Sequence, residues 1–308
     1  MKAARIARYG NEQNIKIEDI AIPEPSANQV QVRVAAVGLN PFDNLVLYGH
    51  ARDMAELEFP ATIGIDFAGT ITKLGNDVSD FKVGDRVYGT ANAMSSASGA
   101  LAEYAITPTT NITKTPNAIS DKEAAALPTA SLTALKTIRQ FGLKSGDRIF
   151  INGGAGGVGT SAIQLAKARG AYVVTSASAD NAEYVKSLGA DEVFDYNETD
   201  YLARIHDCDY LFETVRRDNI SETLSVLKNG GTALSIVGPF DQEIAKKRNI
   251  IAIENPNNLD NALAKLSEAI VNGELAVHIG REFALDDTAS AYFVMNNESV
   301  QGKIVIIV

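Results

Sequence analysis

Residues 153–159 read GGAGGVG, a loop whose backbone is almost bare of side chains. It follows the apolar run at 147–152 and opens a helical pattern, and its G-x-G-x-x-G spacing is formed by Gly154, Gly156 and Gly159. In this setting the glycines permit a tight turn, close approach of a pyrophosphate and close packing of helix on strand. N–H groups at the start of the helix, around Gly157 and Val158, then favour an anion. The loop predicts a dinucleotide site; a glycine-rich turn without a ligand is the alternative.

The end of the next strand selects the nucleotide, because an acidic side chain there would bind the 2′-hydroxyl of NAD. The sequence at this point is TSAS, in which Ser176 and Ser178 offer hydroxyls and no negative charge. Hydrogen-bond donors can be added by Asn181 and Tyr196. NADPH is therefore favoured over NADH. The alternative is that Asp180 turns towards the ribose and selects NADH.

The elements around this loop indicate two domains in one chain. Residues 120–272 alternate helical and strand patterns, which predicts a doubly wound parallel sheet and an α/β fold. Within it, the Ala/Leu-rich stretch 120–142 reads as helix, with a capping box from Ser120 to Glu123. Residues 1–119 and 273–308 read as strands, so a barrel-like β domain is predicted to begin at the N-terminus and close with the C-terminal strand.

Composition limits the class of partner. The 308 residues carry a formal net charge of -10, the wrong sign for binding nucleic acid or anionic lipid. No apolar run reaches the roughly 18 residues of a membrane helix, and the first residues do not resemble a signal peptide, so we expect a cytoplasmic protein. A single cysteine and three scattered histidines predict no metal site.

Five stretches together resemble the medium-chain dehydrogenase/reductase superfamily, in its zinc-free quinone oxidoreductase and enone reductase branch. They run in order through the chain: GIDFAGTITKLGNDVSDFKVGDRVYG (64–89), AEYA (102–105), ISDKEAAALPTASLTAL (119–135), NGGAGGVGTSAIQLAKARGA (152–171) and GKIVIIV (302–308). The resemblance implies a GroES-like catalytic domain at 1–119 and 273–308 and a Rossmann domain at 120–272. It also implies a homodimer.

Departures from the zinc alcohol dehydrogenases within this superfamily indicate metal-free chemistry. Asn40, in GLNPFD, lies near the place of a cysteine ligand, and Ile65 and Asp66 stand where those enzymes have a histidine and an acid. A hydride acceptor must then be electrophilic by itself, as quinones and α,β-unsaturated carbonyl compounds are. The resemblance thus implies an NADPH-dependent, zinc-independent reductase of such small molecules.

Several further residues receive roles from the resemblance. Asn40 is a candidate hydrogen-bond donor to the substrate, and Tyr48 is a candidate proton donor or aromatic wall. The alternatives are a turn-forming asparagine and a tyrosine of the core or the rim. The expected cofactor contacts beyond the glycine loop are Thr133, Val215, Val237 and Gly238. Two other functions stay open: an enoyl-thioester reductase of the same superfamily, and an NADPH-binding protein with a structural or regulatory role.

Overall fold

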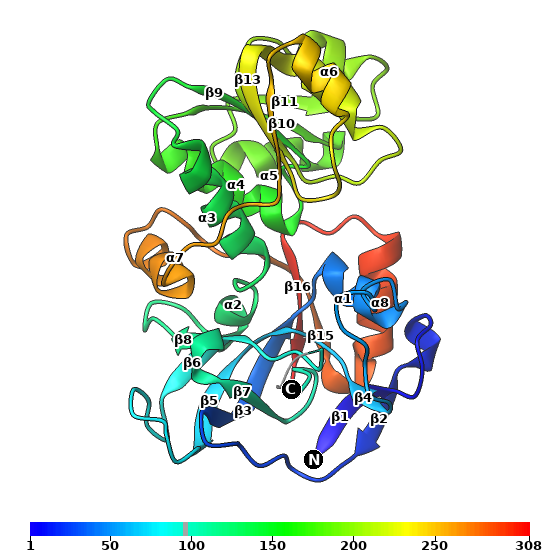
Figure 1. Ribbon diagram of the computed structural model, residues 1–308, viewed down its shortest axis with the longest axis vertical. Helices are drawn as coiled ribbons and strands as arrows, with labels where there is room; N and C mark the ends of the chain where they lie inside the picture. The colour runs from blue at the N-terminus through cyan, green and yellow to red at the C-terminus, as the bar shows by residue number, and fades with distance from the viewer. Residues whose placement is uncertain (95–97) are drawn as a thin grey trace. The chain divides into compact units, whose positions relative to one another are not determined.

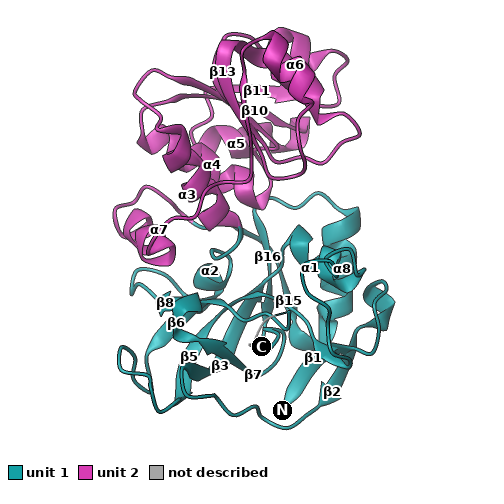
Figure 2. Cartoon of the chain, viewed as in Figure 1, with its two compact units in different colours: residues 1–129, 277–308 teal, residues 130–276 magenta. Residues whose placement is uncertain are grey.

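The computed structural model describes residues 1–94 and 98–308. The chain folds into two compact units, shown in Figure 2: unit 1 comprises residues 1–129 and 277–308, and unit 2 comprises residues 130–276. Unit 1 therefore begins and ends the chain, as the sequence predicted for the β domain. The expected boundaries at 119/120 and 272/273 both lie before the boundaries of the compact units.

Unit 2 is built on a six-stranded parallel sheet. Its strands, in spatial order, are β11 (Glu192–Asp195), β10 (Tyr172–Ala177), β9 (Arg148–Asn152), β12 (Cys208–Glu213), β13 (Leu227–Ser235) and β14 (Ile251–Glu254). The strand order reverses between β9 and β12, which is the place where an open α/β sheet binds a dinucleotide. The predicted doubly wound sheet is confirmed.

The connections of unit 2 cover both faces of this sheet. Helices α4 (Gly157–Ala168) and α5 (Ala182–Ser187) lead from β9 outward to β11, whereas η5 (Ile220–Val226) and α6 (Gln242–Lys247) lead the opposite way to β14. Because such crossovers are right-handed, the two sets lie on opposite faces. Helix α3 (Ala130–Phe141) packs on α4, and α7 (Ala262–Val271) contacts α3. Shorter elements complete the unit: η3 (Ala179–Asn181) and η4 (Tyr201–Arg204).

Unit 1 contains a seven-stranded sheet and a three-stranded sheet. The larger has the order β15 (Ile279–Ala284), β16 (Lys303–Ile307), β3 (Gln29–Gly38), β5 (Asp66–Leu74), β6 (Arg86–Thr90) and β8 (Ile112–Lys114), with β7 (Tyr104–Pro108) also paired to β3. The smaller consists of β2 (Lys16–Asp19), β1 (Lys2–Ile6) and β4 (Ala61–Thr62). Figure 1 shows the C-terminal strand β16 in red beside the blue β3, to which it is antiparallel.

The helices differ from the sequence prediction in two places, the stretch 120–142 and the C-terminal region. The stretch 120–142 forms two helices, α2 (Asp121–Ala125) in unit 1 and α3 in unit 2, because Pro128 cannot continue a helix begun before it. The capping box of α2 is confirmed, with the Glu123 carboxylate accepting from the Ser120 N–H at 2.8 Å. Helix α8 (Thr288–Asn297) lies in a stretch that the sequence had predicted as strand. The remaining helix is α1 (Pro41–Leu47). No helix of the described chain is long and apolar enough to cross a membrane.

Candidate functional site

The glycine loop joins β9 to α4 and depends on two close contacts. A Cβ at Gly159 would lie 2.1 Å from the carbonyl oxygen of Gly153, and one at Gly154 would lie 2.2 Å from the Thr175 hydroxyl. Gly153 has a φ of +87°, a conformation that side chains rarely allow. These positions therefore require glycine for reasons of packing and backbone conformation, whether or not a ligand binds.

Gly156 differs from its neighbours because its side-chain position is open. It is the N-cap of α4, it is exposed, and a Cβ there would meet nothing closer than the Gly153 oxygen at 3.6 Å. The first N–H groups of a helix, here around Gly157 and Val158, have no partner within it and carry the positive end of its dipole. The loop thus offers an open cradle for an anionic group, which fits the diphosphate of a dinucleotide.

A buried hydrogen-bond network, which the sequence analysis did not foresee, holds this loop. The Ser176 hydroxyl donates to the Asn152 side-chain oxygen at 2.5 Å and accepts from the Gly153 N–H at 3.0 Å. The Asn152 amide nitrogen in turn donates to both carboxylate oxygens of Glu213, at 2.8 and 3.0 Å. Ser176 is 1% exposed, so its hydroxyl faces the loop interior and not a ligand. This is a correction to its expected contact with a 2′-phosphate.

The other residues expected at the nucleotide follow the carboxyl ends of strands in unit 2. After β10, the Asn181 amide donates to the Ser178 hydroxyl at 3.0 Å, and after β11 comes the exposed Tyr196. The Val215 N–H donates to Glu213, directly after β12. After β13 come Val237 and Gly238, where a Cβ would meet nothing within 4 Å. Thr133 is half-buried in α3, away from the strand ends in sequence.

Asn40 lies in a buried network of unit 1. Its amide nitrogen donates to the Asp66 carboxylate at 2.9 Å and to the Gly38 carbonyl at 3.3 Å, and its oxygen accepts from the Lys303 ammonium. Lys303 also donates to the Leu39 carbonyl at 2.6 Å. Both ends of the Asn40 side chain are therefore engaged by protein groups, and only 2% of the residue is exposed.

Two carboxyl groups share the single ammonium of this network. Asp66 accepts from the Thr129 N–H at 2.9 Å and the Thr129 hydroxyl at 2.6 Å, and Asp43 accepts from the Asn40 N–H at 2.7 Å. Burial, followed by repulsion from Asp66, raises the pKa of Asp43 to about 7. Burial also raises the pKa of Asp66 and lowers that of Lys303. The Asp43 carboxyl group therefore keeps its proton to a higher pH than a solvent-exposed aspartate does.

Tyr48 lies outside this network, at the end of α1. Its side chain is 37% exposed, its hydroxyl is 3.4 Å from the Glu12 carboxylate, and its ring stacks near His50. Burial and the Glu12 charge raise the pKa of the Tyr48 phenol, so it keeps its proton at neutral pH. Tyr48 is accessible to a ligand, whereas Asn40 is covered.

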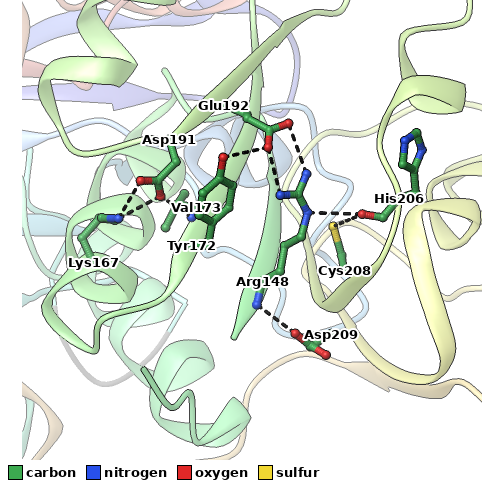
Figure 3. Close-up of polar contacts among 9 residues, drawn as sticks. All are labelled: Arg148, Lys167, Tyr172, Val173, Asp191, Glu192, His206, Cys208 and Asp209. Atoms are coloured by element: carbon green, nitrogen blue, oxygen red, sulfur yellow. Dashed lines mark hydrogen bonds and ion pairs between the residues drawn. The ribbon is translucent and has the colours of Figure 1, made fainter. Parts of the chain in front are cut away.

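The amino ends of the strands of unit 2 carry a different network, shown in Figure 3. The Arg148 guanidinium pairs with both oxygens of Glu192, at 2.9 and 3.1 Å, and Tyr172 donates to the same carboxylate at 2.8 Å. Nearby, burial raises the pKa of the Cys208 thiol to about 11, so the thiol is not a nucleophile at neutral pH. The charges pair with one another at the sheet edge opposite the glycine loop, which indicates a structural role.

Comparison with known proteins gives two family models. The model described as alcohol dehydrogenase GroES-like domain matches residues 26–117, and the model described as zinc-binding dehydrogenase matches residues 157–260. Among residues 1–94 and 98–308, no three or more His, Cys, Asp or Glu side chains are grouped so as to hold a metal ion.

Relatives match along the whole chain. Quinone oxidoreductase of Homo sapiens is 30% identical, and the alignment covers 100% of this chain and 98% of the human one. The 2-methylene-furan-3-one reductase of Solanum lycopersicum is also 30% identical, over 99% of this chain and 79% of its own. Among solved structures, the quinone oxidoreductase from Coxiella burnetii is 31% identical with a TM-score of 0.89, over 100% of this chain and 99% of that one.

The glycine loop predicts opposite outcomes for two alanine substitutions. Gly159→Ala should lower the free energy of unfolding by roughly 2 to 3 kcal/mol, because the new Cβ overlaps backbone atoms that cannot move aside. Gly156→Ala should cost less than about 1 kcal/mol, the price of a poorer N-cap. Urea denaturation of the two variants measures the difference. Equal losses would contradict the packing that we describe.

The buried carboxyl cluster predicts a pH-dependent stability. Asp43 releases its proton near pH 7 in the folded protein and near pH 4 in the unfolded one, so its contribution is present at low pH and is lost as pH rises from 4 to 7. Asp43→Asn should reduce the change in the free energy of unfolding between pH 4 and pH 7 by up to about 4 kcal/mol, since one pKa unit corresponds to about 1.4 kcal/mol. Thermal denaturation between pH 4 and 8 tests this. The exposed Asp53→Asn is the control, and parallel curves for wild type and Asp43→Asn would refute the assignment.

Proposed function

The chain belongs to the medium-chain dehydrogenase/reductase superfamily, in the quinone oxidoreductase branch, and we propose that it reduces quinones or α,β-unsaturated carbonyl compounds with NADPH and without a metal ion. The observation that carries the proposal is the open position at Gly156, at the N-terminus of α4 and at the carboxyl ends of β9 and β10. A backbone so arranged binds a diphosphate. The comparisons support the coarser statement that the chain is a nicotinamide-dependent oxidoreductase.

The fit of NADPH is supported by the side chains that follow β10. Ser178 and Asn181 provide polar groups there, Asp180 between them is exposed, and the exposed Tyr196 follows the neighbouring strand β11. In this proposal these residues face the 2′-phosphate, while the glycine loop holds the diphosphate. Val215, Val237, Gly238 and Thr133 would contact the rest of the cofactor. When bound, NADPH supplies the hydride.

A metal-free reaction is supported by what occupies the buried cluster of unit 1. The Asp66 carboxylate is hydrogen-bonded to Asn40 and Thr129, and the residue before it is the apolar Ile65. The only cysteine, Cys208, lies in unit 2 and is buried. Without a Lewis acid, the acceptor must already be electrophilic, as a quinone or an enone is. The name of the tomato relative, a 2-methylene-furan-3-one reductase, is consistent with an enone.

The protein's own contribution is then to orient the acceptor and to donate a hydrogen bond to its oxygen. One well-placed donor of this kind lowers a barrier by about 3 kcal/mol. We propose Asn40 and Tyr48 for this work. Tyr48 is accessible, and its phenol keeps a proton to donate. The Asn40 amide would donate to a substrate oxygen in place of its longer hydrogen bond, which goes to the Gly38 carbonyl at 3.3 Å. The homodimer and the cytoplasmic location stay predictions.

The cofactor preference can be measured directly. With a quinone acceptor and equal concentrations of NADPH and NADH, turnover should be faster with NADPH, because the residue directly after β10 is Ser178 and not an acid; faster turnover with NADH would instead favour Asp180 as the ligand of the 2′-hydroxyl. Ser178→Asp should shift the ratio at least about tenfold towards NADH by repelling the 2′-phosphate, whereas Ser178→Ala should shift it little. A tenfold preference of the wild-type protein for NADH would overturn the assignment. A 2-enoyl thioester, assayed beside a simple enone, separates the alternative reductase.

The roles of Asn40 and Tyr48 are separable by kinetics. Asn40→Ala should lower kcat by tenfold or more, while the Kd for NADPH changes less, because the lost amide acts on the acceptor and not on the cofactor. Tyr48→Phe removes only the hydroxyl and should lower kcat if the phenol donates the proton. Steady-state kinetics with a quinone, together with NADPH titration, gives both numbers. An unchanged kcat removes the residue concerned from the mechanism.

A further inference from the structure

Glu213 is a fully buried carboxylate at the end of β12, in the middle of the sheet of unit 2. Its two oxygens accept from the Asn152 side-chain amide, and one of them also accepts from the Val215 N–H at 2.9 Å. Burial raises its pKa, and the hydrogen bonds from Val215 and Asn152 oppose that change. Three contacts from N–H donors converge on the two oxygens, which is the arrangement that an ionised carboxylate accepts.

The charge of Glu213 fixes the direction of the hydrogen bonds that follow. An ionised carboxylate only accepts, so the Asn152 side chain must present its NH₂ to Glu213 and its oxygen to Ser176. The Ser176 hydroxyl must then donate to Asn152, which leaves its lone pairs to accept the Gly153 N–H. The donor–acceptor directions are thus set along a chain of hydrogen bonds from Glu213, at the centre of the sheet, to Gly153, the first residue of the glycine loop. An uncharged amide in place of Glu213 could donate as well as accept, so it would not fix these directions.

The same carboxylate also holds the loop on the other side. Val215 follows β12, and a Cβ at Gly153 would lie 2.6 Å from the Val215 side chain and 2.9 Å from the Thr214 hydroxyl. Thr214 donates to the Asn152 carbonyl at 2.5 Å. The loops at 153–156 and 214–217 are therefore packed against each other, with Glu213 bonded to groups that lead into both. Gly153 in turn touches Gly159, so its place affects the first turn of α4.

We propose that Glu213 is a positioning residue for the dinucleotide, acting through Asn152 and Ser176 to aim the backbone of the glycine loop. The inference rests on the proposed function, because it assumes that a dinucleotide binds at this loop. It assigns to one buried charge a role that none of the glycines can fill, since they permit the shape of the loop and do not select its orientation. Glu213 does not touch the reacting atoms.

The test uses the full chain and NADPH, with binding measured by calorimetry. Glu213→Gln keeps the volume of the side chain and allows the Asn152 amide to turn over, so the Kd for NADPH should rise about tenfold, and kcat at saturating NADPH should change much less. Glu192→Gln is the matched control: it breaks the Arg148 pair at the opposite sheet edge, so it should reduce stability and leave the Kd unchanged.

A double substitution separates positioning from general destabilisation. Ser176→Ala removes the acceptor of the Gly153 N–H and should also raise the Kd. Adding Glu213→Gln to Ser176→Ala should raise the Kd little further, so the effects should be less than additive, because without the serine hydroxyl the charge already has nothing to orient. A Kd within twofold of wild type for Glu213→Gln, or full additivity, overturns the inference alone. If Glu213→Gln does not fold, an unchanged Kd in Ser176→Ala overturns it. Failure of the wild-type protein to bind NADPH or NADH overturns the proposed function, and the inference with it.

Discussion

A charge that is buried must find its partners inside the protein, because no water is there to solvate it. Both units of this chain are organised around that constraint. In unit 1, the Lys303 ammonium donates to Leu39 and Asn40 and is attracted by the nearby charges of Asp66 and Asp43, and in unit 2 the carboxylate of Glu213 accepts from N–H groups. In unit 1 Lys303 is hydrogen-bonded to Asn40, a candidate substrate ligand. In unit 2 Glu213 is hydrogen-bonded to Asn152, which precedes the glycine loop.

The two clusters solve the problem differently, with different consequences. Lys303 comes from the C-terminal strand β16 and bonds the loop after β3, so it ties the end of the chain to the Asn40 segment. Burial is the main reason for the raised pKa of Asp43, and repulsion from Asp66, which one ammonium does not cancel, adds to it. Glu213 is held by backbone and amide donors, which are directional and come from adjacent strand ends, and the positive charge of Arg217 is a smaller influence that lowers its pKa. We therefore expect the first cluster to make stability depend on pH between 4 and 7, and we propose that the second orients the glycine loop.

Local patterns in the sequence predicted the parts of this fold that depend on local chemistry. The glycine spacing, the Ser120–Glu123 capping box and the alternation of helix and strand are each written within a few residues, and the doubly wound sheet followed from them. Contacts between distant residues were not predictable in this way. Asn152 and Glu213 are 61 positions apart, and Ser176 looked like a cofactor ligand because only the fold shows that it faces the loop. Helix α8 was missed because its apolar residues do not repeat at helical spacing as clearly as those of α7.

The fewer hydrogen bonds the acceptor needs, the more the candidate donors can also be engaged in structural hydrogen bonds. An acceptor that is already electrophilic needs one or two oriented hydrogen bonds, worth about 3 kcal/mol each, and not a metal ion. Asn40 can meet this need only by giving up its 3.3 Å bond to Gly38, while its bonds to Asp66 and Lys303 keep the amide from turning. The exposed Tyr48 need not break a short hydrogen bond to donate, because its hydroxyl has only a 3.4 Å contact, to the Glu12 carboxylate. In the proposed mechanism the two donors are therefore complementary: the covered Asn40 would set the direction of its hydrogen bond, and the exposed Tyr48, with fewer contacts, would adapt to the acceptor.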